Sequence, residues 1–173
     1  MSPTRRLVVF GGALGLSGCG FRPLYGPISG GAQVRPELAA VYVAVMTERS
    51  GQLLRQALQR RFEGSGEEGV AKLYELTGGL AVVGQSQGIQ SDTSATRVRL
   101  IGSCAWTLRT LGLKPVELAT GNARAVDGYN VNNQQYFAAD LEQASATRRL
   151  AESVADQITL DVASFFRKRL VPA

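Results

Sequence analysis

Cys19 has the clearest chemical potential in this sequence, because a cysteine thiolate is a strong nucleophile. It closes a segment with a basic pair at positions 5–6, an apolar run at Leu7–Leu16 and small residues at 17–18. The apolar run is roughly half of the ~20 residues that a helix needs to cross a bilayer. We therefore predict that residues 1–18 are a signal peptide, which is excluded from the fold and is not a permanent membrane span.

The four residues Leu16-Ser17-Gly18-Cys19 resemble the lipobox of bacterial lipoproteins, in which the cysteine sulfur is acylated before the preceding peptide bond is cut. The alternative is a cysteine that only happens to follow an apolar stretch. The basic start and the four-residue match favour the lipobox, so we predict that Cys19 is lipidated. Acyl chains such as palmitate anchor a protein without a span, since each buried methylene contributes about 0.8 kcal/mol. Gly20 stands where an aspartate would favour retention at the inner membrane, so we expect delivery to the outer membrane.

Arginines at alternating positions are the second group that could carry chemistry. Arg97, Arg99 and Arg109 share one parity of a segment whose other parity is apolar, so in a strand they stand on one face of the sheet. Guanidinium forks match phosphate oxygens two at a time. We therefore name these three arginines as candidate contacts to lipid phosphates, with Arg124 beside them. The alternative is a solvated polar face, which antiparallel sheets commonly show.

The composition limits other chemistry. The chain has 173 residues, 45% of them hydrophobic and 19% charged, which suits one globular domain. It contains no histidine and two cysteines, so the commonest metal ligands and the Ser-His and Cys-His nucleophile pairs are missing. Cys104 falls in the apolar row of a predicted strand and is interpreted as a small buried hydrophobe. We expect no enzyme, no catalytic residue, no metal site and no cofactor.

Three segments lead from the anchor into the fold. Residues 19–36 are rich in glycine and proline, so we predict a lipid-anchored tether in front of a single domain of residues 37–173. The apolar, β-branched run Ala39–Met46 predicts a short buried strand. An amphipathic helix capped by Ser50 follows and ends at a glycine-rich stretch.

Three long alternating segments then predict an antiparallel meander. The first, Tyr74–Val82, is interrupted by Gly78-Gly79 and is expected to bend or bulge there. The second, Val98–Leu108, is the strongest strand pattern of the chain. The third changes parity near Gly121, which indicates another bulge.

The last segment, from about residue 137 to 169, keeps one apolar stripe over some eight or nine turns, which predicts a long helix. A helix that packs on a sheet buries one face, and a single apolar stripe supplies that face. The resulting order is strand, helix, three-strand meander, helix. We therefore predict an α+β two-layer sandwich with both helices on one face of a four-stranded sheet.

The start of the mature chain and several later positions resemble a known family. The most specific part is Cys19-Gly20-Phe21-Arg22-Pro23-Leu24-Tyr25, and Tyr129, Tyr136-Phe137-Ala138 and Glu142 support it. On these residues the chain is similar to the lipopolysaccharide-assembly lipoprotein family LptE, in its alphaproteobacterial form. The resemblance implies an outer-membrane lipoprotein that plugs LptD, the β-barrel that delivers lipopolysaccharide to the cell surface, and assists its assembly. Cys19 is the one functional position that carries over.

The partners that the resemblance implies are an LptD-type barrel, lipopolysaccharide and, through the anchor, the periplasm-facing side of the outer membrane. The alternative is a generic periplasmic lipoprotein that binds a ligand or serves as an accessory subunit of a lipid transporter. A four-stranded RNA-binding domain is disfavoured, because the exposed row carries Arg, Ser and Thr in place of aromatics. Export also separates the protein from nucleic acid, so none is expected as a partner.

Overall fold

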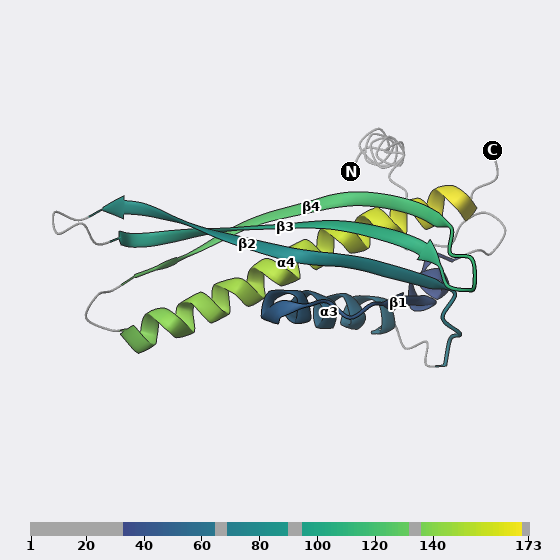
Figure 1. Ribbon diagram of the computed structural model, residues 1–173, viewed down its shortest axis with the longest axis horizontal. Coiled ribbons are helices and arrows are strands. Elements are labelled where there is room, and N and C mark those ends of the chain that lie inside the picture. Colours follow the sequence, from purple (N-terminus) through teal and green to yellow (C-terminus); the bar gives the residue numbers. More distant parts are fainter. Residues whose placement is uncertain (1–32, 65–68, 90–94, 132–135, 171–173) are drawn as a thin grey trace, which may run out of the picture.

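The structure, a computed structural model, describes residues 33–64, 69–89, 95–131 and 136–170. Its elements, in chain order, are α2 (Val34–Ala39), β1 (Val41–Val43), α3 (Glu48–Glu63), β2 (Tyr74–Ile89), β3 (Ala95–Thr110), β4 (Glu117–Asn130) and α4 (Tyr136–Leu170). The strands form one sheet in the order β1-β2-β3-β4. β1 runs parallel to β2, and the other neighbours are antiparallel. Helices α3 and α4 cover the same face of this long sheet (Figure 1), which confirms the predicted two-layer α+β fold.

Alternation along the strands creates the buried face of the sheet. In β3, Leu100, Cys104, Trp106 and Leu108 are buried, whereas the odd-numbered positions face away from the helices. Helix α4 lays its apolar stripe over this face with Ala146, Leu150, Ala151, Val154, Ala155, Ile158, Val162, Ala163 and Phe166, all of which are buried. Burial of this apolar surface is the main stabilising contribution to the fold.

Trp106 lies on the buried face between two glycines of the neighbouring strands. It pairs with Gly78 of β2 on one side and with Gly121 of β4 on the other. A Cβ atom on Gly121 would stand 2.6 Å from the indole ring of Trp106, and one on Gly78 would stand 3.1 Å from the carbonyl oxygen of Ala105. Gly121 therefore makes room for the indole ring, and Gly78 allows a close approach to the β3 backbone. Pairing passes both glycines without a register shift, so the bulge considered at Gly78-Gly79 is wrong and the one predicted near Gly121 is not at the glycine itself.

The change of parity in β4 has a different origin. Leu108 pairs with Ala119, but Arg109 pairs with Glu117, so the register shifts and Leu118 is an extra residue. An extra residue of this kind is a β-bulge. Beyond it, Ala123 and Ala125 are buried against the helical layer, in agreement with the parity expected for them.

The start of the domain differs from the sequence-based expectation. Helix α2 includes residues 34–36, which the prediction assigned to the tether, and it buries Val34 and Leu38. Pro36 stands in the first turn of this helix, where a backbone N–H has no intrahelical partner to lose. Strand β1 therefore pairs over three residues only, a shorter range than the predicted Ala39–Met46.

Ser50 does not cap helix α3, as the sequence pattern predicted. The helix begins two residues earlier, at Glu48, and Thr47 occupies the cap position. The Ser50 hydroxyl instead donates a hydrogen bond to the carbonyl oxygen of Leu80 at 3.0 Å. The side chain therefore joins the helix to strand β2.

Ion pairs hold the long helix α4 to its neighbours. Arg61 of α3 donates to Asp156 at 2.6 Å, and Arg149 of α4 donates to Asp127 of β4 at 2.8 Å. Burial alone would raise the pKa of the Asp127 carboxyl, but hydrogen bonds from Arg149 and from the Gly128 N–H outweigh burial and lower it. Asp127 therefore stays ionised and bonded at neutral pH.

Strand β2 has a long edge without a strand neighbour among the described elements. Strand β1 pairs only with residues Tyr74–Leu76 of β2, whereas β2 continues to Ile89. The stretch Thr77–Ile89 contains neither a charged residue nor a proline. Charges and prolines are the usual features that keep an edge strand from pairing with another chain.

Candidate functional site

The sheet face turned away from the helices carries the predicted arginines, but the pairing separates them. Arg97 and Arg99 lie near the β2–β3 hairpin end, whereas Arg109 lies twelve residues further along β3. At about 3.3 Å per residue this places it roughly 40 Å away. The three arginines therefore cannot contact one phosphate group.

Arg97 and Arg99 stand among uncharged neighbours on this face. Arg97 pairs with Gln87 and Asn130, and Arg99 pairs with Gln85 and Gly128. Both arginine side chains are exposed. The four paired neighbours carry no charge, and no ion pair joins either arginine to another of the described residues.

The two arginines line a shallow hollow of about 380 Å³, together with Gln87, Val126, Asp127 and Gly128. Gly128 lines the hollow without a side chain, and a Cβ atom there would stand 3.0 Å from the carbonyl oxygen of Val98 and 3.7 Å from the Arg97 Nε. Asp127 is the acidic group of the hollow, and Arg149 on α4 already binds it. The hollow is thus a cationic recess of the kind that accepts a phosphate or another anion.

Arg109 stands in a different electrostatic setting. It pairs with Glu75 of β2 on one side and with Glu117 of β4 on the other. Opposite charges directly across strands stabilise a sheet modestly. This arrangement gives Arg109 a role in sheet pairing, whereas Arg97 and Arg99 line a hollow and remain candidate contacts to a phosphate.

Arg124, the fourth arginine of this face, lies between the two ends. It pairs with Ser103, and its backbone N–H donates to the Gln157 side chain of α4 at 3.0 Å. The row formed by Val83, Ile101 and Val126 separates it from Arg99. Val83 and Val126 are about half exposed, so this row adds an apolar surface beside the cationic recess.

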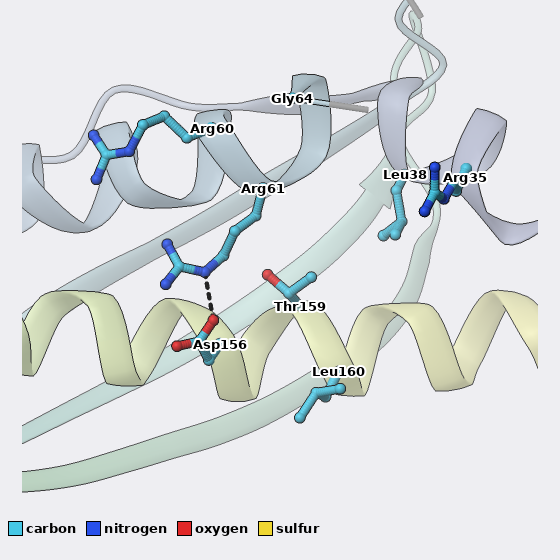
Figure 2. A pocket seen from close by; sticks show the side chains of 8 residues that line it. All are labelled: Arg35, Leu38, Arg60, Arg61, Gly64, Asp156, Thr159 and Leu160. Atoms are coloured by element: carbon cyan, nitrogen blue, oxygen red, sulfur yellow. Dashed lines mark hydrogen bonds and ion pairs between the residues drawn. The ribbon is translucent and has the colours of Figure 1, made fainter. Parts of the chain in front are cut away.

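A second hollow, of about 470 Å³, lies between helices α2, α3 and α4. Figure 2 shows Arg61 reaching across it to Asp156, with Arg35 and Leu38 at the α2 side. Arg60, at its rim, lies 3.5 Å from Glu152. Arg60 and Arg61 form ion pairs between α3 and α4. We therefore interpret this hollow as part of the packing between the helices.

The structure describes one of the two cysteines. Cys104 is fully buried, and burial raises the pKa of its thiol, so the residue is a core side chain as predicted. Cys19, the predicted lipidation site, lies outside the described residues. Within the described ranges, no group of three or more His, Cys, Asp or Glu side chains could hold a metal ion.

None of the described helices is both long enough and apolar enough to cross a membrane. Helices cover one face of the sheet, and no described element covers the opposite face, which carries the cationic recess. Residues 38–162, most of the chain, match the sequence model of the lipopolysaccharide-assembly family LptE, and the chain belongs to this family. No curated protein is similar enough in sequence to match the chain.

Solved structures of bacterial lipoproteins share the fold. A candidate lipoprotein from Caulobacter crescentus CB15 is 28% identical, with a TM-score of 0.62 over 81% of this chain and 98% of that one. The rare lipoprotein B from Shewanella oneidensis is 12% identical, with a TM-score of 0.52 over 75% of this chain and 97% of that one. The second likeness extends to the fold alone.

Proposed function

We propose that the protein is an outer-membrane lipoprotein that plugs an LptD-type β-barrel, assists its assembly and contacts lipopolysaccharide. Membership of the lipopolysaccharide-assembly family is the observation that carries this proposal. The lipobox at Cys19 supplies the anchor. The bare sheet face, with its cationic recess, supplies the surface for a partner and for lipid.

The shape of the domain suits a plug. Strands of sixteen residues are about 53 Å long at 3.3 Å per residue, and the 35 residues of α4 give a similar length at 1.5 Å each. The sheet is four strands wide, so the domain is a long, narrow body (Figure 1). Large outer-membrane barrels enclose a lumen wide enough to hold such an element.

The middle of the bare face matches the lining of a barrel. Thr77, Thr107 and Thr120 form one cross-strand row, and Ala105 and Asn122 belong to the next. These side chains are small and uncharged, and Arg124 in the neighbouring row is the charged residue of this region. The interior of an outer-membrane barrel is polar, so such a lumen can accept both the uncharged rows and the arginine.

Lipopolysaccharide carries phosphate groups next to acyl chains, and the recess offers a partner for each. Arg97 and Arg99 can pair with phosphate oxygens. The apolar row of Val83, Ile101 and Val126 lies directly beside them. A ligand with both chemistries therefore matches the face better than a free anion does.

Affinity purification from membranes tests the proposal. The tagged lipoprotein is solubilised in mild detergent, and the co-purifying proteins are identified by mass spectrometry. We expect an outer-membrane β-barrel of the LptD type in stoichiometric amount. Recovery of the lipoprotein without any barrel would contradict the proposed plug function. It would favour the alternative, a generic lipoprotein that binds a ligand or serves as an accessory subunit of a lipid transporter.

The anchor has its own test. Cys19→Ala removes the thiol that accepts the acyl chain, so we expect an unprocessed precursor without lipid, detected by the mass of the intact protein. A lipid-modified, processed protein in that variant would contradict the assignment of Cys19.

A further inference from the structure

The turn between β3 and β4 exposes an unusual concentration of apolar side chains. Leu113 is fully exposed at 105%, Val116 is 59% exposed, Leu73 55% and Leu111 47%. The N–H of Leu111 donates to the carbonyl oxygen of Leu73 at 2.8 Å, so the two segments are neighbours. These four residues are termed the apolar tip. Single exposed hydrophobic residues are common, but a group at one edge indicates a contact surface.

Hydrogen bonds hold the apolar tip in shape. The N–H of Thr110 donates to the carbonyl oxygen of Val116 at 2.9 Å, and the N–H of Val116 donates to the Thr110 hydroxyl at 2.8 Å. These two bonds close the base of the turn, and Leu113 stands at its apex. A turn fixed at its base loses little conformational entropy when its apex enters another medium.

Cations outnumber acids around the apolar tip. Lys114 follows Leu113 in the turn, and Lys168 and Arg169 are exposed at the end of α4, which lies at the same end of the molecule (Figure 1). The charge of Arg169 acts on the phenol of Tyr74, the residue after Leu73. Two acids at this end have partners, since Glu37 accepts the Tyr74 hydroxyl and Glu63 pairs with Lys72. Glu75 and Glu117 flank Arg109 in the strand register.

The anchor reaches the domain at this end. The carbonyl oxygen of Ala40 accepts hydrogen bonds from the N–H groups of Leu73 and Tyr74, so α2 ends beside the apolar tip. The other end of this six-residue helix, at Gln33, is about 9 Å away. Fourteen residues separate Gln33 from Cys19, and a chain of that length spans at most about 50 Å. The hairpin end lies a full strand length, about 53 Å, beyond the apolar tip.

We propose that the apolar tip inserts into the anionic bilayer that holds the acyl chains of Cys19. Leu111, Leu113 and Val116 enter the boundary between headgroups and acyl chains, and Lys114 and Arg169 bind lipid phosphates. This second contact fixes the direction in which the domain stands on the membrane. The inference rests on the anchored lipoprotein of the proposed function.

Quenching by brominated lipids tests the insertion. The full lipoprotein is reconstituted into vesicles of phosphatidylethanolamine and phosphatidylglycerol whose acyl chains carry bromine, and its tryptophan fluorescence is compared with that in unbrominated vesicles. Leu113→Trp places a probe at the apex, and Phe137→Trp is the matched control, since Phe137 is 88% exposed at the opposite end of the domain. The parent protein, with buried Trp106, gives the baseline.

We expect bromine to remove about half of the fluorescence added by Leu113→Trp, because an inserted residue lies within about 10 Å of the acyl chains, and to leave that added by Phe137→Trp unchanged. Equal quenching in both variants, or none in either, overturns the insertion. Replacing phosphatidylglycerol by phosphatidylcholine should weaken the quenching. Unchanged quenching would show that Lys114 and Arg169 do not contribute to the insertion.

The mass of the same preparation separates this inference from the anchor. Acylated protein without quenching overturns the insertion and leaves the lipoprotein assignment intact. Protein without acyl chains that is still quenched overturns the anchor and leaves the insertion. Protein with neither property overturns both.

Discussion

The two ends of the sheet are built differently, although the same strands run through both. At the end near α2, Tyr74 packs against Phe166 with tilted rings whose centroids are 5.0 Å apart, and Ile158 and Val162 are fully buried. At the hairpin end, Phe137 and Leu141 of α4 are 88% and 71% exposed. One end is a consolidated core, and the other leaves apolar helix positions and two arginines open to solvent.

The arginines of β3 follow the same division. Arg109, at the consolidated end, stands between two glutamates, whereas Arg97 and Arg99, at the open end, border a recess. Residues of one type, on one face of one strand, therefore stand in two different electrostatic settings. The open end buries fewer apolar side chains of α4, so we expect it to contribute less to the stability of the fold.

The largest expected effect distinguishes the two ends of α4. Ile158→Ala removes a fully buried side chain, and such truncations cost about 2 to 5 kcal/mol. Leu141→Ala, at an exposed position of the same stripe, should change the free energy of unfolding by less than about 0.5 kcal/mol. Chemical denaturation of both variants measures the difference. Equal effects would mean that α4 is covered evenly along its length.

A second pair of substitutions concerns the buried face of the sheet. Gly121→Ala forces the rigid indole of Trp106 to move, and overpacking of this kind costs about 1 to 3 kcal/mol. Gly84→Ala, towards the hairpin end, meets its nearest side chain at 3.5 Å, which is ordinary contact. We expect a lower melting temperature for Gly121→Ala only. If Gly121→Ala has the melting temperature of the parent protein, the indole ring of Trp106 can move into another position without cost.

The third prediction concerns lipid binding. Replacing Arg97 and Arg99 by Gln should weaken lipopolysaccharide binding roughly tenfold or more, since charge-assisted contacts contribute about 1.5 to 3 kcal/mol and exposed ones less. Arg109→Gln, on the same face, is the control and should bind as the parent does. Titration at two salt concentrations measures both, and the parent's affinity should fall with salt. If both variants lose the same lipopolysaccharide affinity, all three arginines contribute to binding and the division between them is wrong.

The smallest effect depends on pH. The pKa of Asp127 is lower in the folded protein than its usual value of about 3.9. Its ion pair with Arg149 therefore stabilises the fold above that pH, and this contribution is lost as the pH falls through the folded-state pKa. Asp127→Asn should be less stable than the parent at pH 7, and the gap should close towards pH 2. If the difference in stability between the parent and Asp127→Asn does not change with pH, the variant loses stability through packing and not through the ion pair.

Local patterns were sufficient to predict the layers of the fold. The alternation of Val98–Leu108 and the stripe that ends near Phe166 each specify a buried face, and only one arrangement covers both. The fine structure of the sheet was not accessible in this way. Gly78 and Gly121 could be understood only when pairing brought them beside Trp106, because a glycine that makes space looks the same in sequence as one that bends a strand.

The candidate site shows the same limit. The parity of Arg97, Arg99 and Arg109 predicted a common face, which the strand pairing bears out. Their grouping depends on strands β2 and β4, whose register places glutamates beside Arg109 and a glycine beside Arg99. A single strand pattern contains no information about these neighbours, and the apolar tip likewise depends on contact between Leu73 and Leu111.

The uncharged edge of β2 has a consequence for the life of the protein in the cell. From Thr77 to Ile89 it has no neighbouring strand among the described elements, and it contains no charge and no proline to deter pairing. If the proposed barrel covers this edge, copies outside the complex are templates for one another and for other extended chains. Overproduction of the protein by itself should therefore yield aggregates rich in β structure.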